Sequence, residues 1–303
     1  MNLIVLAVLI PQLAAVVLVF GRGALSTRVA ARIGALAMAL TLFAVVGVWT
    51  QEPDTGSRWR SEIDLPWIET LRVHFHLGLD GVSWPLALMT ALLAILACLA
   101  LADSDIGSPS LVALVLVISG ASIGVFASLD LVLFFLFFEL ALIPMWFVIA
   151  WWGDPHDEPG RRYAATRFLL FTVLGSALML VGFVLVAVHT DSLQIDAVKA
   201  SGFGGSSGLL AVSLIAAGFA VKTPLVPLHT WLPDAHSKAP TVGSVLLAGV
   251  FLKLGTYGLL RMCVDMLPAD TARIAPYLAV AGVGGIIYSG LACLGQDDLK
   301  RMI

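Results

Sequence analysis

Nine stretches of mostly apolar residues limit what this chain can fold into. A transmembrane α-helix needs about 20 such residues, whereas a membrane-spanning β-strand needs only about 10 of alternating polarity. Of the 303 residues, 59% are hydrophobic and only 12% are charged, about half the roughly 25% of charged residues in a soluble domain. The sequence therefore predicts an all-α fold, a polytopic membrane helix bundle that sits in the lipid bilayer. The predicted spans are 2–20, 29–50, 81–102, 110–128, 130–152, 164–188, 208–228, 241–263 and 275–294.

The charge balance and the cysteines exclude several classes of protein. The formal net charge is −3 and no basic stripe is present, so we expect no nucleic-acid partner. Cys98, Cys263 and Cys293 lie in or at the end of apolar stretches without C-x-x-C spacing, as expected of small hydrophobic side chains and not of a metal or disulfide site. The sequence also lacks a G-x-G-x-x-G or Walker motif, and no nucleotide or hydrolytic chemistry is expected on this chain.

The connecting segments give an orientation. Lys and Arg in the connections and at the span ends number nine on one side and six on the other. The positive-inside rule places the nine in the cytoplasm and therefore the N-terminus outside. Residues 51–80 form the longest polar connection and are expected over the outer face. Residues 192–200 are expected to form a short interfacial helix, and 201–208 a flexible linker.

Three ionisable residues lie in predicted spans away from the span ends: Glu139, Lys222 and Lys253. A charge at the centre of a bilayer costs on the order of 3 kcal/mol on insertion scales, so such residues pair with a partner, reach internal water or serve a function. Glu139 has about ten apolar residues on each side, and its helical neighbours offer no hydrogen bond to a carboxylate. It is predicted to carry a proton; a purely structural ion pair between helices is the alternative.

Lys222 is followed by two prolines, Pro224 and Pro227. Each proline lacks an amide donor, so the carbonyls of Ala220 and Thr223 are predicted to lose their helical partners. A helix that breaks at membrane depth survives only where protein or water surrounds it. The break therefore predicts a hydrated ion site near the bilayer centre, against the alternative of a kinked helix whose lysine extends to the interface.

Lys253 lies about 12 residues into its span, too far from either end to reach the interface. Gly249 and Gly255 are predicted to permit close helix packing there. Thr256 and Tyr257 lie one turn further along the same face, where they could hold water. Burial favours the neutral form of a lysine, so this residue is predicted to release a proton readily, although a structural pair is again the alternative.

His229 and His236 flank the sequence TWLPDA just after the predicted break. Their spacing matches no common metal site, so we expect no metal there. They are candidates for the entrance of a proton path. The spans carry no axial histidine pair for a haem.

Three segments of the chain resemble the antiporter-like membrane subunits of respiratory complex I. They are FFELALIPMW at 137–146, LGLDGVSWPLALMT at 77–90 and Val221–Arg261, whose sequence is VKTPLVPLHTWLPDAHSKAPTVGSVLLAGVFLKLGTYGLLR. Within this family, AHSKAPT is most similar to the subunit M branch, the bacterial counterpart of mitochondrial chain 4.

The resemblance implies roles for the buried charges. Glu139, Lys222 and Lys253 would match the family's proton-path glutamate and lysines. The chain would translocate protons for an NADH-quinone oxidoreductase and would itself hold no cofactor, because FMN, the iron–sulfur clusters and quinone belong to other subunits. Its partners would be neighbouring membrane subunits of complex I, above all other antiporter-like ones, in the bacterial plasma membrane.

The resemblance also implies a division of the chain. The family has about 14 helices in two inverted halves. Residues 1–102 would hold the first three helices and the outer loop, 103–263 the first five-helix half, and 264–303 the ninth helix and the start of the second half. Because Gln296 to Asp298 resemble a helix start, we expect the chain to be part of a longer protein.

Two alternatives remain open from sequence. Large subunits of Mrp-type Na⁺/H⁺ antiporters share the same motifs and would use the buried charges for ion exchange. A scaffold bundle would hold the same charges as inert ion pairs.

Overall fold

The computed structural model describes residues 2–52, 56–297 and 300. Within them, nine helical spans are long and apolar enough to cross a membrane, which confirms the predicted helix bundle and its nine spans. The spans are Leu3–Gly21 (α1), Thr27–Thr50 (α2), Ser83–Leu101 (α3), Pro109–Ala127 (α4), Leu131–Trp152 (α5 and α6), Glu158–His189 (α7), Gly205–Lys222 (α9), Thr241–Asp265 (α11, η2, α12 and η3) and Pro268–Cys293 (α13).

The chain divides into two compact units. Unit 1 comprises Met1–Val148 and Thr241–Phe251, and unit 2 comprises Ile149–Pro240 and Leu252–Ile303. Glu139 belongs to unit 1, whereas Lys222 and Lys253 belong to unit 2. The functional boundaries expected at residues 102 and 263 stay predictions.

In unit 1, α4 is almost wholly buried and contacts α1, α2 and α3. Small side chains allow this, and the hydroxyl groups of Ser119 and Ser122 donate to carbonyls of their own helix, at 2.8 and 2.7 Å. Gly124 lets the next helix approach, because a Cβ atom at this position would lie 2.5 Å from the ring of Phe137. Two residues before Glu139, α5 (Leu131–Leu140) is therefore fixed against α4.

The long connection 51–80 contains a β-hairpin that the sequence did not predict. Strands β1 (Arg60–Ile68) and β2 (Val73–Leu79) pair antiparallel around the one-turn 3₁₀ helix η1 (Glu69–Leu71). The backbone N–H of His74 on β2 donates to Asp130, which also caps the first turn of α5. Burial raises the pKa of the Asp130 carboxyl, and these three backbone donors oppose that effect.

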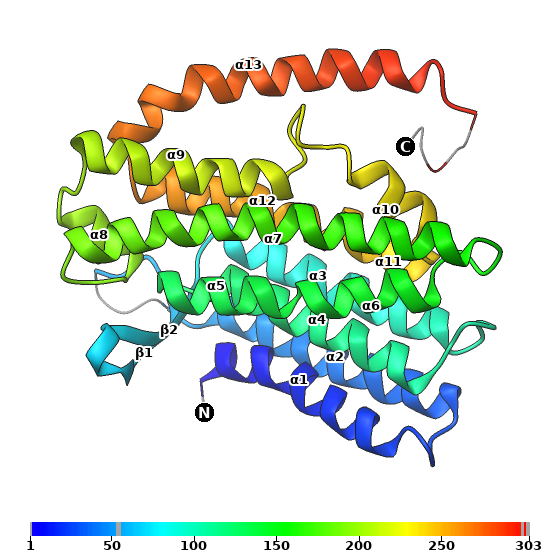
Figure 1. The fold of residues 1–303 in the computed structure, drawn as a ribbon. Coiled ribbons are helices and arrows are strands. Elements are labelled where there is room, and N and C mark those ends of the chain that lie inside the picture. The colour runs from blue at the N-terminus through cyan, green and yellow to red at the C-terminus, as the bar shows by residue number, and fades with distance from the viewer. Residues whose placement is uncertain (1, 53–55, 298–299, 301–303) are drawn as a thin grey trace. The chain divides into compact units, whose positions relative to one another are not determined.

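In unit 2, α7 and α9 lie side by side (Figure 1) and contact each other through glycines. A Cβ atom at Gly218 would lie 2.5 Å from the Gly175 carbonyl oxygen, and one at Gly182 would lie 2.6 Å from Ile215. Small residues at such crossings let two membrane helices approach closely. This contact fixes α9, the helix that ends in Lys222.

Three further segments of unit 2 are the helix α8, the connection to α9 and the last span, α13. The short helix predicted within residues 192–200 exists as α8 (Ile195–Ala200), and its place at the membrane interface stays a prediction. The predicted linker 201–208 is only partly correct, because α9 already begins at Gly205. α13 keeps most of its apolar side chains exposed. The helix start expected at Gln296 to Asp298 lies partly outside the described residues.

Candidate functional site

The helix break lies immediately after Lys222. α9 ends there, residues 223–231 form turns, and the short helix α10 (Leu232–Lys238) follows. The predicted span 208–228 is therefore too long, since the regular helix stops six residues earlier. A complete break, as opposed to a kinked continuous helix, confirms the interruption predicted from Pro224 and Pro227.

Two carbonyls at this break have partners, contrary to the prediction for Ala220, whereas the prediction for Thr223 stays open. Although Pro224 lacks an N–H group, Leu225 donates to the Ala220 oxygen at 2.9 Å. Trp231, which is fully buried, donates from its indole Nε1 to the Val221 oxygen at 3.0 Å. Groups of the protein itself thus donate to these two carbonyls at the end of α9. One extra residue in the turn brings the N–H group of Leu225, in place of that of Pro224, to the Ala220 oxygen.

Lys222 is 2% exposed and lies in the last turn of α9. A helix C-terminus carries partial negative charge, which favours a cation at this position. The burial excludes the alternative in which the lysine extends to the interface. Beside it, the hydroxyl oxygen of Thr223 is buried and has no hydrogen-bond partner among the described residues. The sequence reasoning considered only the carbonyl of Thr223 and did not single out its hydroxyl group. A hydroxyl next to a lysine in an apolar helix was the signal that could have identified it.

The backbone near Lys253 packs directly against the end of α9. Lys253 is half-buried in α12 (Leu252–Gly258), and α12 contacts α9. A Cβ atom at Gly255 would lie 2.5 Å from the Thr223 hydroxyl oxygen and 3.2 Å from the Lys222 carbonyl carbon. The structure therefore brings together the segments that carry the two lysines, and it confirms the predicted close packing at Gly255.

Two π-helical turns flank α12: η2 (Leu247–Phe251) and η3 (Leu259–Asp265). π-Helical turns are rare and often lie at functional sites. In unit 1, the segment before Lys253 is fixed by Gly249, where a Cβ atom would lie 2.4 Å from Leu93. This contact confirms the second predicted glycine. Thr256 donates its hydroxyl to the Lys253 carbonyl oxygen at 3.2 Å, and the expectation that Thr256 and Tyr257 hold water stays a prediction.

Glu139 lies in the last turn of α5, where the span is interrupted at Ala141 before α6 (Leu142–Trp152) begins. Its Oε1 atom is buried and has no hydrogen-bond partner among the described residues. The indole Nε1 of Trp146, seven residues later, is in the same condition. Buried polar groups without partners are uncommon and cost about 1–3 kcal/mol. Unit 1 thus holds a half-buried carboxyl group with one buried oxygen, and its pairing with Lys222 stays a prediction.

The two histidines both lie in unit 2, beyond the helix break. His229 packs edge-on against Tyr288 of α13, with ring centroids 5.1 Å apart, and its buried Nδ1 has no hydrogen-bond partner in the described part of the chain. His236 is half-buried on α10, where burial, followed by the charge of Lys300, lowers its pKa. No three His, Cys, Asp or Glu side chains gather as a metal site would require within the described residues. The proton-entrance role of the two histidines stays a prediction.

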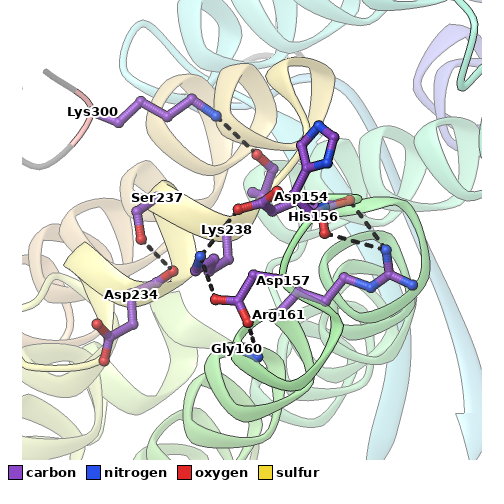
Figure 2. Close-up of polar contacts among 11 residues, drawn as sticks. Asp154, His156, Asp157, Gly160, Arg161, Asp234, Ser237, Lys238 and Lys300 are labelled. Atoms are coloured by element: carbon purple, nitrogen blue, oxygen red, sulfur yellow. Dashed lines mark hydrogen bonds and ion pairs between the residues drawn. The ribbon is translucent and has the colours of Figure 1, made fainter. Parts of the chain in front are cut away.

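Ion pairs hold α10 against the start of α7. Figure 2 shows Lys238 between two carboxylates, Asp157 at 2.6 Å and Asp154 at 3.1 Å. Hydrogen bonds from Lys238 and Gly160 lower the pKa of Asp157, and bonds from His156 and Lys238 lower that of Asp154.

Ion pairs hold both ends of α10 against α7 and the residues before it. The two carboxylates raise the pKa of Lys238, that of Asp157 most strongly. One turn earlier, Asp234 pairs with Arg167 of α7. The helix that carries His236 is therefore tied to α7 at both ends within unit 2.

Comparisons with known proteins agree with this arrangement. Residues 128–303 match the family model described as the NADH:quinone oxidoreductase/Mrp antiporter transmembrane family. The chain is 42% identical over 276 residues to NAD(P)H-quinone oxidoreductase chain 4 1 of Picosynechococcus sp., with 88% of this chain and 50% of that protein covered. It is 39% identical over 286 residues to NADH-quinone oxidoreductase subunit M of Escherichia coli K12, with 89% of this chain and 56% of that protein covered.

A solved structure matches as well. The chain superposes on a chain of respiratory complex I from Thermus thermophilus with bound NADH, with a TM-score of 0.85 and 27% sequence identity. The match covers 99% of this chain and 61% of the other. The chain thus spans about half the length of the curated relatives that it matches.

Proposed function

Because the chain belongs to the NADH:quinone oxidoreductase/Mrp antiporter transmembrane family, we propose that it is the proton-translocating part of a membrane subunit of NADH-quinone oxidoreductase. In this proposal the subunit lies in the bacterial plasma membrane and contacts other membrane subunits of the complex. NADH oxidation and quinone reduction take place in other subunits of the complex, so this chain binds no FMN, iron–sulfur cluster or quinone.

One observation carries the proposal: Lys222 is buried at the end of a broken helix, and the helix of Lys253 packs directly against it. Burial disfavours a charged ammonium group unless a counter-charge is near. A lysine at this position therefore takes up or releases a proton when a neighbouring charge changes. Lys253, on the adjoining helix, is the next acceptor in the sequence of transfers.

Glu139 supplies the changing charge in this mechanism. When its carboxylate approaches Lys222, the ammonium form is stabilised. When the two separate, Lys222 releases its proton towards Lys253. Because the energy of an ion pair in a medium of low dielectric constant is large, a small movement caused by quinone reduction elsewhere is enough to drive the transfer. His229 and His236 would deliver the replacement proton.

The Mrp-type Na⁺/H⁺ antiporter is the second candidate, since the family model includes it. The named relatives at about 40% identity are NADH- or NAD(P)H-quinone oxidoreductase subunits, and this favours the first candidate. A sodium gradient imposed on vesicles without NADH separates the two. Proton flux driven by that gradient would support the antiporter and refute the first candidate.

The main test replaces Lys222 with methionine, which has a similar length and no charge. We expect the complex to assemble and to lose most of its NADH-driven proton uptake into membrane vesicles. Arg162→Met is the matched control, because Arg162 is an exposed cation on α7. Normal proton uptake in an assembled Lys222→Met complex would refute the proposed function.

A further inference from the structure

A column of polar residues leads from Lys253 along its own helix. Lys253, Tyr257, Arg261 and Asp265 are spaced four residues apart. In α12 this spacing puts the first two on one face. Beyond them the chain is π-helical, from Leu259 to Asp265. A π-helix has i to i+5 hydrogen bonds, so its wider turn keeps residues four apart on nearly the same face.

From Tyr257 onward, direct contacts within unit 2 join the column. Arg261 is 3% exposed; its Nε donates to the Tyr257 hydroxyl oxygen at 3.2 Å and its Nη1 donates to Asp265 at 2.9 Å. The other carboxylate oxygen of Asp265 accepts from Lys199 of α8 at 2.9 Å. The Lys199 side chain is 45% exposed, so the column begins at a half-buried lysine and ends at the surface.

The chemistry of arginine decides what this column can do. A guanidinium group stays protonated at all physiological pH values, so Arg261 cannot pass a proton on. It is also a fixed positive charge that repels an approaching hydronium ion, as arginines in other membrane pores do. Tyr257 and Asp265 hold it in place, and burial reduces the screening of its charge.

We propose that Arg261 is an electrostatic barrier that prevents a proton on Lys253 from escaping along its own helix to the surface at Lys199. This inference rests on the proposed function of Lys253 as a proton carrier. It adds a residue whose role is to keep translocation coupled: the proton must leave Lys253 by another route, and it cannot leak down the membrane potential through this end of the bundle.

The test measures passive proton leak through the purified complex in liposomes, without NADH. A potassium gradient with valinomycin sets the potential, and an enclosed pH-sensitive dye reports proton entry. Arg261→Gln should raise the leak about tenfold, the order expected when a unit charge about 10 Å away is removed at an effective dielectric constant of about 20. Arg261→Lys keeps the charge and should stay within about twofold of the unmodified complex at neutral pH.

Arg273→Gln is the matched control, because Arg273 is an exposed arginine of unit 2 that pairs with Asp270. It should not change the leak. An assembled Arg261→Gln complex without added leak would overturn the barrier. A leak in Arg261→Lys equal to that in Arg261→Gln would also overturn it, because the residue would then act by packing and not by charge.

Asp265→Asn decides the matter if Arg261→Gln fails to assemble. It removes an anchor of Arg261 but leaves the column more positive, so a charge barrier predicts no added leak. A raised leak in Asp265→Asn would overturn the proposal. The proposed function fails separately, through normal pumping in Lys222→Met, because the leak measurement uses no NADH.

Discussion

Gly255 lies so close to Lys222 that a Cβ atom at position 255 would be 3.2 Å from the Lys222 carbonyl carbon. The nearest atoms of the neighbouring segment include the backbone nitrogen of Thr223, at 2.9 Å from that Cβ position. Backbone atoms cannot move aside as the end of a flexible side chain can. The approach of the two lysine-bearing helices therefore depends on the absence of a side chain at position 255.

Gly255→Ala should disturb this contact. Overpacking of a tight interior costs about 1–3 kcal/mol, and here the strain would separate α12 from the end of α9. We expect a complex that assembles but pumps protons at well under half of the unmodified rate. Proton uptake and quinone-dependent NADH oxidation in vesicles provide the measurement.

Gly282→Ala is the control for this substitution. Gly282 lies in α13, and a Cβ atom there meets nothing within 4 Å. It should leave pumping unchanged. Equal rates for the two variants would show that close packing at position 255 has no functional role.

A second prediction concerns the ion pairs that hold α10. Lys238→Gln removes the cation that bridges Asp154 and Asp157, so amide hydrogen exchange in α10 should become several times faster. Lys238→Arg keeps the charge and should restore most of the protection. If the Gln and Arg variants exchange equally fast, the bridge does not hold the helix.

A third prediction follows from the lowered pKa of His236. A histidine whose folded pKa lies below its ordinary value of about 6.5 binds a proton more weakly in the folded state. Its contribution to stability is thus complete above that value and is lost as the pH falls through the folded pKa. Exchange protection of α10, corrected for intrinsic rates, should fall as the pH drops below about 6.5. In His236→Gln this dependence should disappear; its persistence would assign it to another group.

The sequence predicted the membrane spans well because burial in lipid is a local property. Whether a run of about 20 apolar residues can span the bilayer depends on its own length and hydrophobicity. The spans in the structure therefore begin and end within a few residues of most predictions. The break after Lys222 was also predictable, because Pro224 acts on its own helix.

The parts that were missed depend on residues distant in sequence. The Val221 carbonyl accepts a hydrogen bond from the indole of Trp231, ten residues later. No local sequence pattern indicates which residue will donate this bond. The contact between Gly255 and Thr223 joins two spans, and the bridge from Lys199 through Asp265 to Arg261 joins α8 to η3. The prolines and the buried charges identified the candidate residues, but only the packing shows which of their segments meet.

The most direct test of the central claim compares two substitutions at Glu139, whose buried Oε1 atom has no hydrogen-bond partner in the described structure. Glu139→Gln keeps the volume and the hydrogen-bonding capacity but cannot ionise, whereas Glu139→Asp keeps the charge on a shorter side chain. The measurement is NADH-driven proton uptake in vesicles that contain the two assembled variants. If Glu139 is a charge that drives proton transfer, Asp should retain substantial uptake and Gln almost none. Equal uptake, or more uptake with Gln than with Asp, would contradict a proton-translocating role and would leave Glu139 as a structural group.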